Sequence, residues 1–204
     1  MSIVNGYCTL AEIKAEVGIP TGDTQDDALL EIAVESASRL VDAYCNRRFW
    51  QDGSAVARYY TTTDWQTIDI DGLATTTGLV VKTDDDDDGV YETTWTLNTD
   101  YSLEPANAAA DGLPYTRIVV SDTGSKAFPT SNRGVEVTAQ YGWAAVPLTV
   151  KQATLIQAAR LFKRKDSPYG VAGSPDMGNE MRLLAKLDPD VQVLLTPFKR
   201  YVIA

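Results

Sequence analysis

The 204-residue sequence contains no histidine. Histidine provides the general base of serine-type triads, ligands of most catalytic zinc sites and the usual acid or base near neutral pH. Catalysis would therefore have to rest on carboxylates, lysine or tyrosine, and no motif here positions such groups. We predict that the protein is not an enzyme, with no catalytic residue, no metal ligand and no cofactor.

Cysteines and long hydrophobic runs are also scarce. Cys8 and Cys45 fit neither a disulfide framework nor a zinc pattern, which favours buried thiols in a reducing compartment. No apolar run approaches the roughly 18 residues of a membrane span, and the N-terminal residues do not resemble a signal peptide. The sequence predicts an unexported protein without membrane contact, and its 44% hydrophobic content is enough for a core.

Acidic residues exceed basic ones, and the excess is uneven along the chain. The net charge is −10. Residues 1–143 carry 9 Lys and Arg against 23 Asp and Glu, a net charge of −14, whereas residues 144–204 carry 9 against 5, a net charge of +4. This asymmetry indicates two surfaces with different electrostatic partners.

Residues 1–49 have the pattern of two helices. Thr9 with Glu12 forms a capping box before the first helix, and Gly18 ends it. A second, long helix is predicted within TQDDALLEIAVESASRLVDAYCNRRF. Its expected buried face, at helical spacing, consists of Leu29, Ala33, Ala37, Leu40 and Tyr44.

Residues 50–145 have a different texture, with β-branched and aromatic residues in short runs separated by glycine, proline and asparagine turns. Val135, Val137 and Ala139 alternate with polar residues, as in a half-buried strand. The expected strands are Ala57–Thr61, Thr67–Ile70, Leu79–Thr83, Val90–Leu97, Arg117–Ser121 and Val135–Tyr141.

Residues 146–204 are predicted to be helical again, with a long helix after Pro147 and a short one that Asp188 caps. A lone helical pair buries its apolar faces poorly. We therefore predict an α+β fold: a helical bundle formed by residues 1–49 and 146–204, with an antiparallel β domain, residues 50–145, inserted. The expected apolar stripe of the long helix is Leu148, Val150, Leu155, Ala158, Ala159, Leu161 and Phe162.

The stretch KTDDDDDGVYETTW has the spacing that opens an EF-hand calcium loop, with Asp84, Asp86, Asp88 and Gly89. The bidentate glutamate of such a loop belongs at position twelve, which is Trp95, and the flanks read as strands rather than helices. Asp-Gly between two β runs is a hairpin signal. We interpret the stretch as a solvated hairpin tip, not a metal site.

Basic and aromatic residues gather near the C-terminus, and each group has two explanations. The cations at the end of the long helix either complement the helix dipole or contact an anionic partner. The aromatic residues of the C-terminal segment either staple the core or anchor a neighbouring protein. The residues concerned are Arg160, Lys163, Arg164, Lys165, Phe198, Lys199, Arg200 and Tyr201.

Both helical segments resemble those of head–tail connector proteins of long-tailed bacteriophages, also called adaptor or head-completion proteins. The resemblance rests on YCTLAEIKAEVGIP, DDALLEIAVESASRLVDAYCNRRF, ARLFKRKDSPYGVAG and the ending LDPDVQVLLTPFKRY. It implies a structural virion protein that forms a ring, commonly of twelve subunits, at the neck. Such a ring joins the portal vertex of the capsid to the tail and continues the DNA channel.

The resemblance further implies that the chain assembles in the cytoplasm of the bacterial host and contacts three kinds of partner: its own copies, the portal protein, and a stopper or tail-completion protein. DNA would pass without sequence-specific binding. The eight basic and aromatic residues near the C-terminus are then the expected partner interface. The alternative is that the β domain is a calcium- or carbohydrate-binding module of another phage structural protein.

Overall fold

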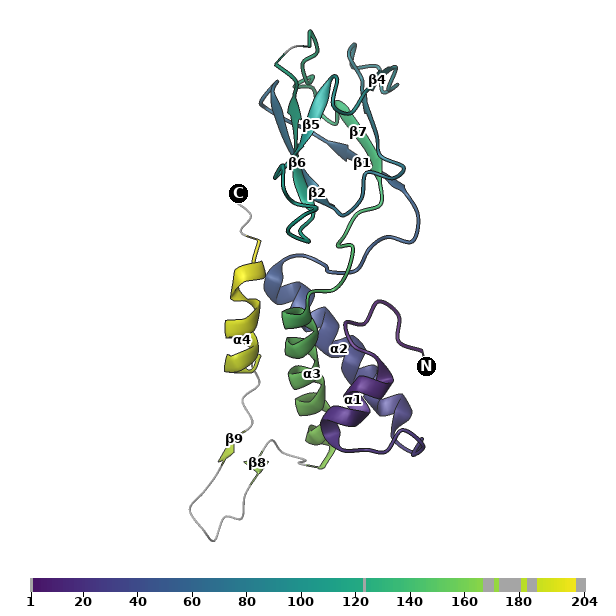
Figure 1. Cartoon of the computed structure of the whole chain (residues 1–204), viewed down its shortest axis with the longest axis vertical. Helices are drawn as coiled ribbons and strands as arrows, with labels where there is room; N and C mark the ends of the chain where they lie inside the picture. Colours follow the sequence, from purple (N-terminus) through teal and green to yellow (C-terminus); the bar gives the residue numbers. More distant parts are fainter. Residues whose placement is uncertain (1, 123, 167–170, 173–180, 183–186, 201–204) are drawn as a thin grey trace. The chain divides into compact units, whose positions relative to one another are not determined.

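The structure, a computed structural model, describes residues 2–122, 124–166, 171–172, 181–182 and 187–200. Within these residues, four α-helices and two larger antiparallel sheets confirm the α+β class (Figure 1). The chain divides into two compact units. The helical unit comprises Met1–Phe49 and Val146–Ala204, and the β unit comprises Trp50–Ala145.

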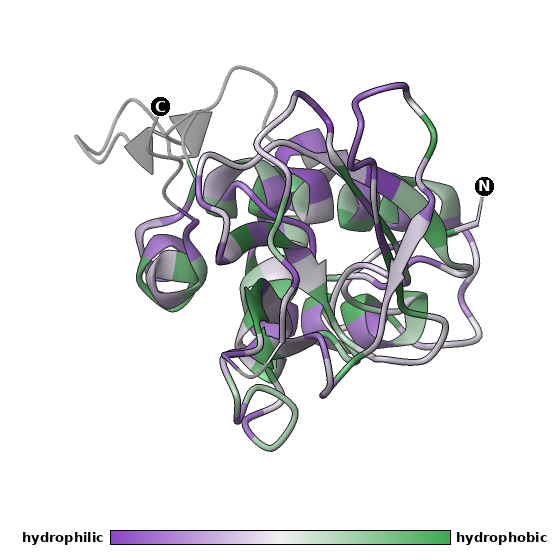
Figure 2. Ribbon diagram, turned by 90° about the horizontal axis from the view of Figure 1, so that it is seen from above, coloured by the Kyte–Doolittle hydropathy of each residue, from purple (hydrophilic) through white to green (hydrophobic). Residues whose placement is uncertain are grey.

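The four described α-helices belong to the helical unit, and helical ribbons in Figure 2 carry both hydrophilic and hydrophobic residues, as expected for amphipathic helices. Among the described residues, no helix combines the length and the hydropathy that crossing a bilayer requires. The elements are α1 (Leu10–Val17), α2 (Asp27–Cys45), α3 (Leu148–Lys163), α4 (Pro189–Leu195), two 3₁₀ turns (Arg164–Asp166 and Thr196–Phe198), and the short paired strands β8 (Val171–Ala172) and β9 (Met181–Arg182).

Helix α1 begins and ends as predicted. The Thr9 hydroxyl accepts the backbone N–H of Glu12 at 3.3 Å, and the Glu12 carboxylate accepts the backbone N–H of Thr9 at 2.8 Å. This capping box satisfies two N–H groups that the helix leaves without carbonyl partners. Gly18 ends the helix with φ 79°, a left-handed conformation that favours glycine.

The buried face of α2 differs from the predicted one. Leu29 and Leu40, expected in the core, are 49% and 39% exposed, and Tyr44 is half-buried. The helix has apolar residues at helical spacing on two sides, and packing against α1 and α3 selects only one of them. The residues that are buried are Leu30, Ala33, Val34, Ala37, Ser38, Val41 and Cys45.

The apolar stripe of α3 is as expected except at its first residue, Leu148, which is 80% exposed. Leu148 is the first residue of the helix. The other stripe residues are buried or partly buried, and several share a hydrophobic core with α1 and α2. That core contains Cys8, Ile13, Leu30, Ala33, Val34, Ala37, Ala158, Ala159 and Phe162.

Among the described residues of the helical unit, one charged side chain is buried. Lys14 of α1 is only 3% exposed, and its ammonium group pairs with the carboxylate of Asp27. The same nitrogen donates to the backbone carbonyls of Asp23 at 2.7 Å and Thr21 at 3.3 Å. A buried ammonium needs such partners, so Lys14 fixes the connection between α1 and α2.

The β unit consists of two antiparallel sheets, in the orders β1-β7-β3-β4 and β2-β6-β5. Six of its strands overlap the predicted ones. Strand β5 was not predicted, because its four residues lie in a segment rich in turn residues. The strands are β1 (Val56–Tyr60), β2 (Thr67–Leu73), β3 (Val80–Thr83), β4 (Thr93–Trp95), β5 (Tyr101–Glu104), β6 (Tyr115–Val120) and β7 (Val135–Ala139).

The two sheets enclose their own hydrophobic core. Val135, Val137 and Ala139 of β7 are fully buried, which confirms the alternation seen in the sequence. Trp95 of β4 stacks on Phe128 with ring centroids 4.6 Å apart. Each unit therefore buries apolar side chains of its own, and the core of the β unit consists of residues from both sheets.

Candidate functional site

The acidic stretch connects β3 to β4, which pair antiparallel, so the hairpin prediction is confirmed. Asp84, at the end of β3, is 4% exposed. Its two carboxylate oxygens accept the backbone N–H groups of Asp88 at 3.2 Å and Gly89 at 2.9 Å. Gly89 has φ 88°, where a glycine is favoured. The first aspartate thus holds the turn in shape.

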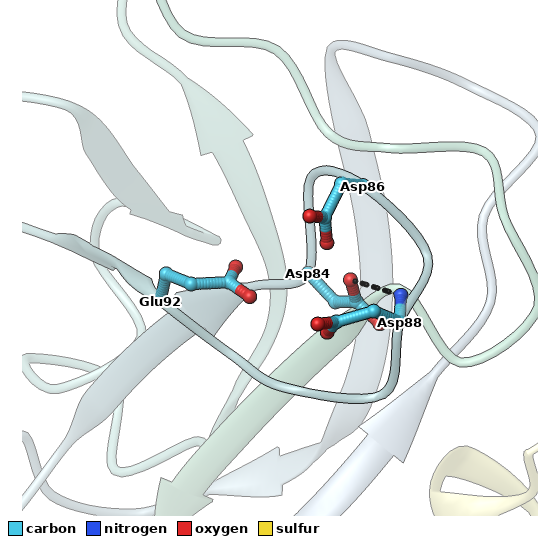
Figure 3. A group of neighbouring side chains, drawn as sticks. All are labelled: Asp84, Asp86, Asp88 and Glu92. Carbon is cyan, nitrogen blue, oxygen red and sulfur yellow. Dashed lines mark hydrogen bonds between the residues drawn. The ribbon is translucent and has the colours of Figure 1, made fainter.

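Four carboxylates gather inside this turn: those of Asp84, Asp86, Asp88 and Glu92 all have an oxygen within 4.8 Å of the others (Figure 3). Trp95, at position twelve of the EF-hand spacing, is buried in the core and offers no ligand. Glu92, at position nine, was missed because only the position-twelve ligand was considered. Carboxylate oxygens are ligands that suit a hard divalent cation such as calcium.

A pocket of about 400 Å³ lies beside the acidic turn. The rings of Tyr59 and Tyr91 lie 5.5 Å apart, and the guanidinium of Arg133 lies 4.5 Å from the centre of the Tyr59 ring. The Tyr91 hydroxyl donates to the backbone carbonyl of Arg133 at 2.7 Å. The pocket therefore combines aromatic faces with polar groups. Its lining residues are Tyr59, Asp84, Asp87, Asp88, Gly89, Tyr91, Asn132 and Arg133.

The cations at the end of α3 contact other parts of the helical unit. Arg160 pairs with Asp188 at 3.3 Å, and Lys165 pairs with Asp26, just before α2, at 2.6 Å. Lys163 is exposed and Arg164 is half-buried. Two of the four predicted interface cations therefore form ion pairs that join helices within the chain.

The C-terminal group contacts the opposite end of α2. Phe198 packs edge-on against Phe49 with ring centroids 5.6 Å apart, and the ammonium of Lys199 lies 4.1 Å from the ring centre of Tyr44. The backbone N–H of Arg200 donates to the carbonyl of Cys45 at 2.9 Å. Phe198 thus contacts the core, and the predicted role of Tyr201 concerns a residue outside the described part of the chain.

The structure separates the predicted interface residues into two groups. Lys165 lies at the start of α2, whereas Lys199 and Arg200 lie at its end, and 19 helical residues at about 1.5 Å each make roughly 28 Å. Arg47, which was not among the predicted residues, lies near Arg200 of the second group. Burial and the nearby charge of Arg200 lower the pKa of Arg47.

A third polar cluster lies where the N-terminal segment meets α2. The Tyr7 hydroxyl donates to the carboxylate of Asp42 and accepts the backbone N–H of Phe49 at 2.8 Å. Burial raises the pKa of Tyr7, and burial also raises the pKa of Asp42. These hydrogen bonds tie the N-terminal segment to α2 and to the residue Phe49 that follows it.

The fold is similar to that of a solved neck protein. The comparison structure is described as "Neck of empty GTA particle computed with C6 symmetry", and the similarity covers 100% of this chain and 95% of that chain, with a TM-score of 0.58 and 20% sequence identity. The comparison therefore shows that the two chains share a fold over their full lengths.

Residues 7–73 match the family described as "Phage gp6-like head-tail connector protein". The match covers α1, α2 and the first two strands, and the resemblance to head–tail connector proteins is thereby confirmed. It does not extend to residues 146–204, on which the resemblance also rested. No curated protein sequence matches the chain.

Proposed function

We propose that the protein is a ring-forming head–tail connector, a structural and non-enzymatic component of the virion neck. The observation that carries the proposal is the full-length fold similarity to a neck protein, together with the family match over residues 7–73. The ring joins the portal vertex to the tail and continues the DNA channel, and it assembles in the cytoplasm of the bacterial host.

The helices from both ends of the chain form the bundle on which the ring is built. In support, α1, α2 and α3 share one hydrophobic core, and ion pairs join Glu12 to Lys151 and Asp26 to Lys165 across it. The β unit is a domain inserted between α2 and α3 that has its own core. A rigid bundle suits a ring because each copy must present the same surfaces to its neighbours.

Twelve copies make the ring, and its partners are the portal protein on one side and a stopper or tail-completion protein on the other. The comparison neck was computed with C6 symmetry, with which rings of six or twelve subunits are compatible. The β unit holds 5 Lys and Arg against 15 Asp and Glu, so it does not favour binding to DNA phosphates. DNA therefore passes without sequence-specific contact.

The partner interface includes the exposed cation Lys163 with Arg164, and Lys199 with Arg200 at the other end of the helical unit. Separation by roughly 28 Å along α2 means that the two groups contact different partners or different parts of one partner. Arg160 and Lys165 also contribute through the ion pairs that hold α3 to its neighbours. Phe198 and Tyr201 complete the proposed interface.

Electron microscopy of necks purified from infected cells tests the function, with the chain located by an antibody or a tag. We expect the chain in a ring between the head and the tail. A knockout should accumulate DNA-filled heads without tails, and complementation with Lys163→Glu/Arg164→Glu should restore fewer tailed particles than the wild type. Tailed particles that lack the chain altogether would refute the connector role.

A second candidate function, a carbohydrate- or calcium-binding module of another phage structural protein, has one observation in its favour. The pocket beside the acidic turn presents two tyrosine rings and Arg133 at its surface. Aromatic faces beside hydrogen-bonding groups suit a sugar. Titration calorimetry with neutral oligosaccharides tests this candidate. Binding that Tyr59→Ala abolishes would favour the binding-module function. The absence of a heat of binding would contradict this candidate and leave the connector role as the proposed function.

A further inference from the structure

The pocket beside the acidic turn opens on the outer side of the sheet β1-β7-β3-β4. Tyr59 of β1 is opposite Glu136 of β7 in the register, and Glu136 lies between the buried Val135 and Val137. Alternate residues of a strand lie on opposite faces, so Tyr59 lies on the face turned away from the core of the β unit. Tyr59 is 44% exposed, and a ligand can therefore reach it from solvent.

Carboxylates outnumber cations in the lining of this pocket. Three aspartates of the acidic turn line it together with one cation, Arg133, which gives a net charge of −2. Glu136 and Lys82, which follow on the same face of the sheet, are partners in the register and balance each other. A negative pocket disfavours phosphates and other anions and attracts a cation.

The three aspartates differ in what they offer a ligand. Both oxygens of Asp84 accept backbone N–H groups of the turn, and one oxygen of Asp88 accepts the backbone N–H of Val90 at 2.8 Å. Asp87 is exposed, and within the described part of the chain its carboxylate has no hydrogen bond or ion pair. Asp87 is therefore the carboxylate with which an incoming cation can pair.

Two tyrosine rings give the pocket its second property. The rings of Tyr59 and Tyr91 are inclined to each other by 35°, with centroids 5.5 Å apart. The guanidinium of Arg133 lies over the Tyr59 ring, so this ring already stacks with a guanidinium of its own chain. The face of a tyrosine ring attracts cations, and a planar guanidinium stacks on it better than a compact ammonium does. The aromatic part of the pocket thus suits an arginine.

We propose that this pocket binds the side chain of an arginine that belongs to a neighbouring protein in the neck. The guanidinium pairs with the carboxylate of Asp87 and packs against the rings of Tyr59 and Tyr91. A neutral sugar gains nothing from the negative charge, whereas a guanidinium uses both the charge and the rings. That the arginine comes from a protein rests on the proposed function, because a neck component has DNA and proteins as neighbours and DNA offers phosphates rather than cations.

Saturation-transfer NMR on the purified chain tests the chemistry of the pocket, with acetyl-arginine methylamide as the probe. We expect a dissociation constant on the order of millimolar, because one exposed cation–π contact and one charge pair are weak. Acetyl-citrulline methylamide has nearly the same shape without the charge and should bind at least about fivefold more weakly. Equal affinities of the two probes, or no binding of the arginine probe, would overturn the proposal.

Two variants locate the binding of the probe. Asp87→Asn removes one charge and keeps the backbone, because asparagine also tolerates the left-handed conformation of residue 87, with φ 62°. Tyr59→Ala removes one ring. Each variant should weaken binding of the arginine probe about threefold to tenfold.

The matched control is Asp111→Asn, at an exposed aspartate of the β unit that does not line the pocket. This variant should bind the arginine probe as the wild type does. Circular dichroism confirms that each variant is folded, and Asp87→Asn decides the question by itself if Tyr59→Ala does not fold. Equal affinities of Asp87→Asn and Asp111→Asn would show that the probe binds elsewhere and would overturn the assignment.

Photo-cross-linking in assembled particles tests the partner. A photoreactive phenylalanine analogue takes the place of Asn132, an exposed residue of the pocket lining, or of Asp111 as the control. We expect the analogue at position 132 to cross-link to a neighbouring protein at a peptide that contains an arginine, and Asp87→Asn in the same chain to lower the yield severalfold. A cross-link to a peptide without arginine, or none from particles that contain the chain, would overturn the docking.

The outcomes separate this pocket from the proposed function. If the chain is present in the neck and both the NMR and the cross-linking results are negative, the connector role stands and the arginine pocket is wrong. If complete necks lack the chain, the connector role and the docking in the neck are both wrong, and the NMR titration decides separately whether the pocket binds arginine.

Discussion

The helical unit and the β unit differ most in charge. Residues 1–49 and 146–204 together hold 13 Lys and Arg and 13 Asp and Glu, so the helical unit is neutral. Residues 50–145 hold 5 against 15, so the β unit carries the whole net charge of −10. Along the chain the charge is acidic first and basic last, but in space the acidic N-terminal helices pack with the basic α3.

This comparison shows that charge has a different role in each unit. In the helical unit, cations of one helix meet carboxylates of another, as in the pairs Lys14–Asp27 and Lys151–Glu12. In the β unit, a third of the carboxylates lie in the single run Asp84–Asp88. Opposite charges therefore help to align the helices, whereas the excess negative charge of the β unit disfavours contact between its surface and polyanions.

The strongest test of this division removes one unit. Replacing residues 50–145 by a short glycine-serine linker should leave a helical protein that unfolds cooperatively, because the core of α1, α2 and α3 contains no residue of the β unit. Circular dichroism should keep its helical signal through one thermal transition. A molten or insoluble product would mean that the β unit supplies an essential part of the core.

The next largest effect distinguishes the two apolar faces of α2. Leu30→Ala should lower the free energy of unfolding by about 2–5 kcal/mol, because Leu30 is fully buried. The neighbouring Leu29→Ala should change it by less than about 1 kcal/mol, because Leu29 is half exposed in the single chain. Denaturant unfolding of both variants measures the difference. Equal losses of unfolding free energy in the two variants would mean that Leu29 is a core residue as well.

A smaller effect is expected inside the acidic turn. Asp84→Ala should cost about 1–3 kcal/mol, because two backbone N–H groups lose their acceptors. Asp86→Ala should be neutral or slightly stabilising, because it removes one of four carboxylates that repel one another.

Thermal melts with and without calcium sharpen this comparison. If the hairpin tip binds no metal, the wild type, Asp84→Ala and Asp86→Ala have the same order of stability with and without calcium. A rise of several degrees with millimolar calcium, which Asp86→Ala removes, would show that the turn binds a cation and would contradict the hairpin-tip interpretation.

The smallest effect concerns Glu12, which accepts from Lys151 of α3 and from the backbone of Thr9. The hydrogen bond from Lys151 and that from the Thr9 backbone lower the pKa of Glu12. Because the folded-state pKa is below the unfolded value of about 4.3, the stabilisation is present above that pH and is lost as the pH falls further. Glu12→Gln should cost about 0.5–1 kcal/mol at neutral pH.

Unfolding curves of Glu12→Gln and the wild type at pH 7 and pH 3 measure this dependence. The difference between the two proteins should shrink at the lower pH. If the difference in unfolding free energy is the same at both pH values, the negative charge of Glu12 does not contribute to stability.

Local chemistry allowed several features to be predicted from the sequence by itself. The capping box of Thr9 and Glu12, the left-handed end at Gly18 and the alternation of β7 depend on residues close in sequence, so the pattern is sufficient. The class of fold and the hairpin at the aspartates were predictable for the same reason. The expected set of interface residues, in contrast, joined two groups that lie at opposite ends of α2.

Only the tertiary structure decided which apolar side of α2 is buried, where charges pair and which carboxylates meet. Both sides of α2 have helical spacing, and the contact with α3, more than a hundred residues away, selects Leu30 over Leu29. The same long-range packing neutralises the charge of the N-terminal helices. Glu92 joins the aspartates only because β3 and β4 pair in one register, which sequence spacing alone does not determine.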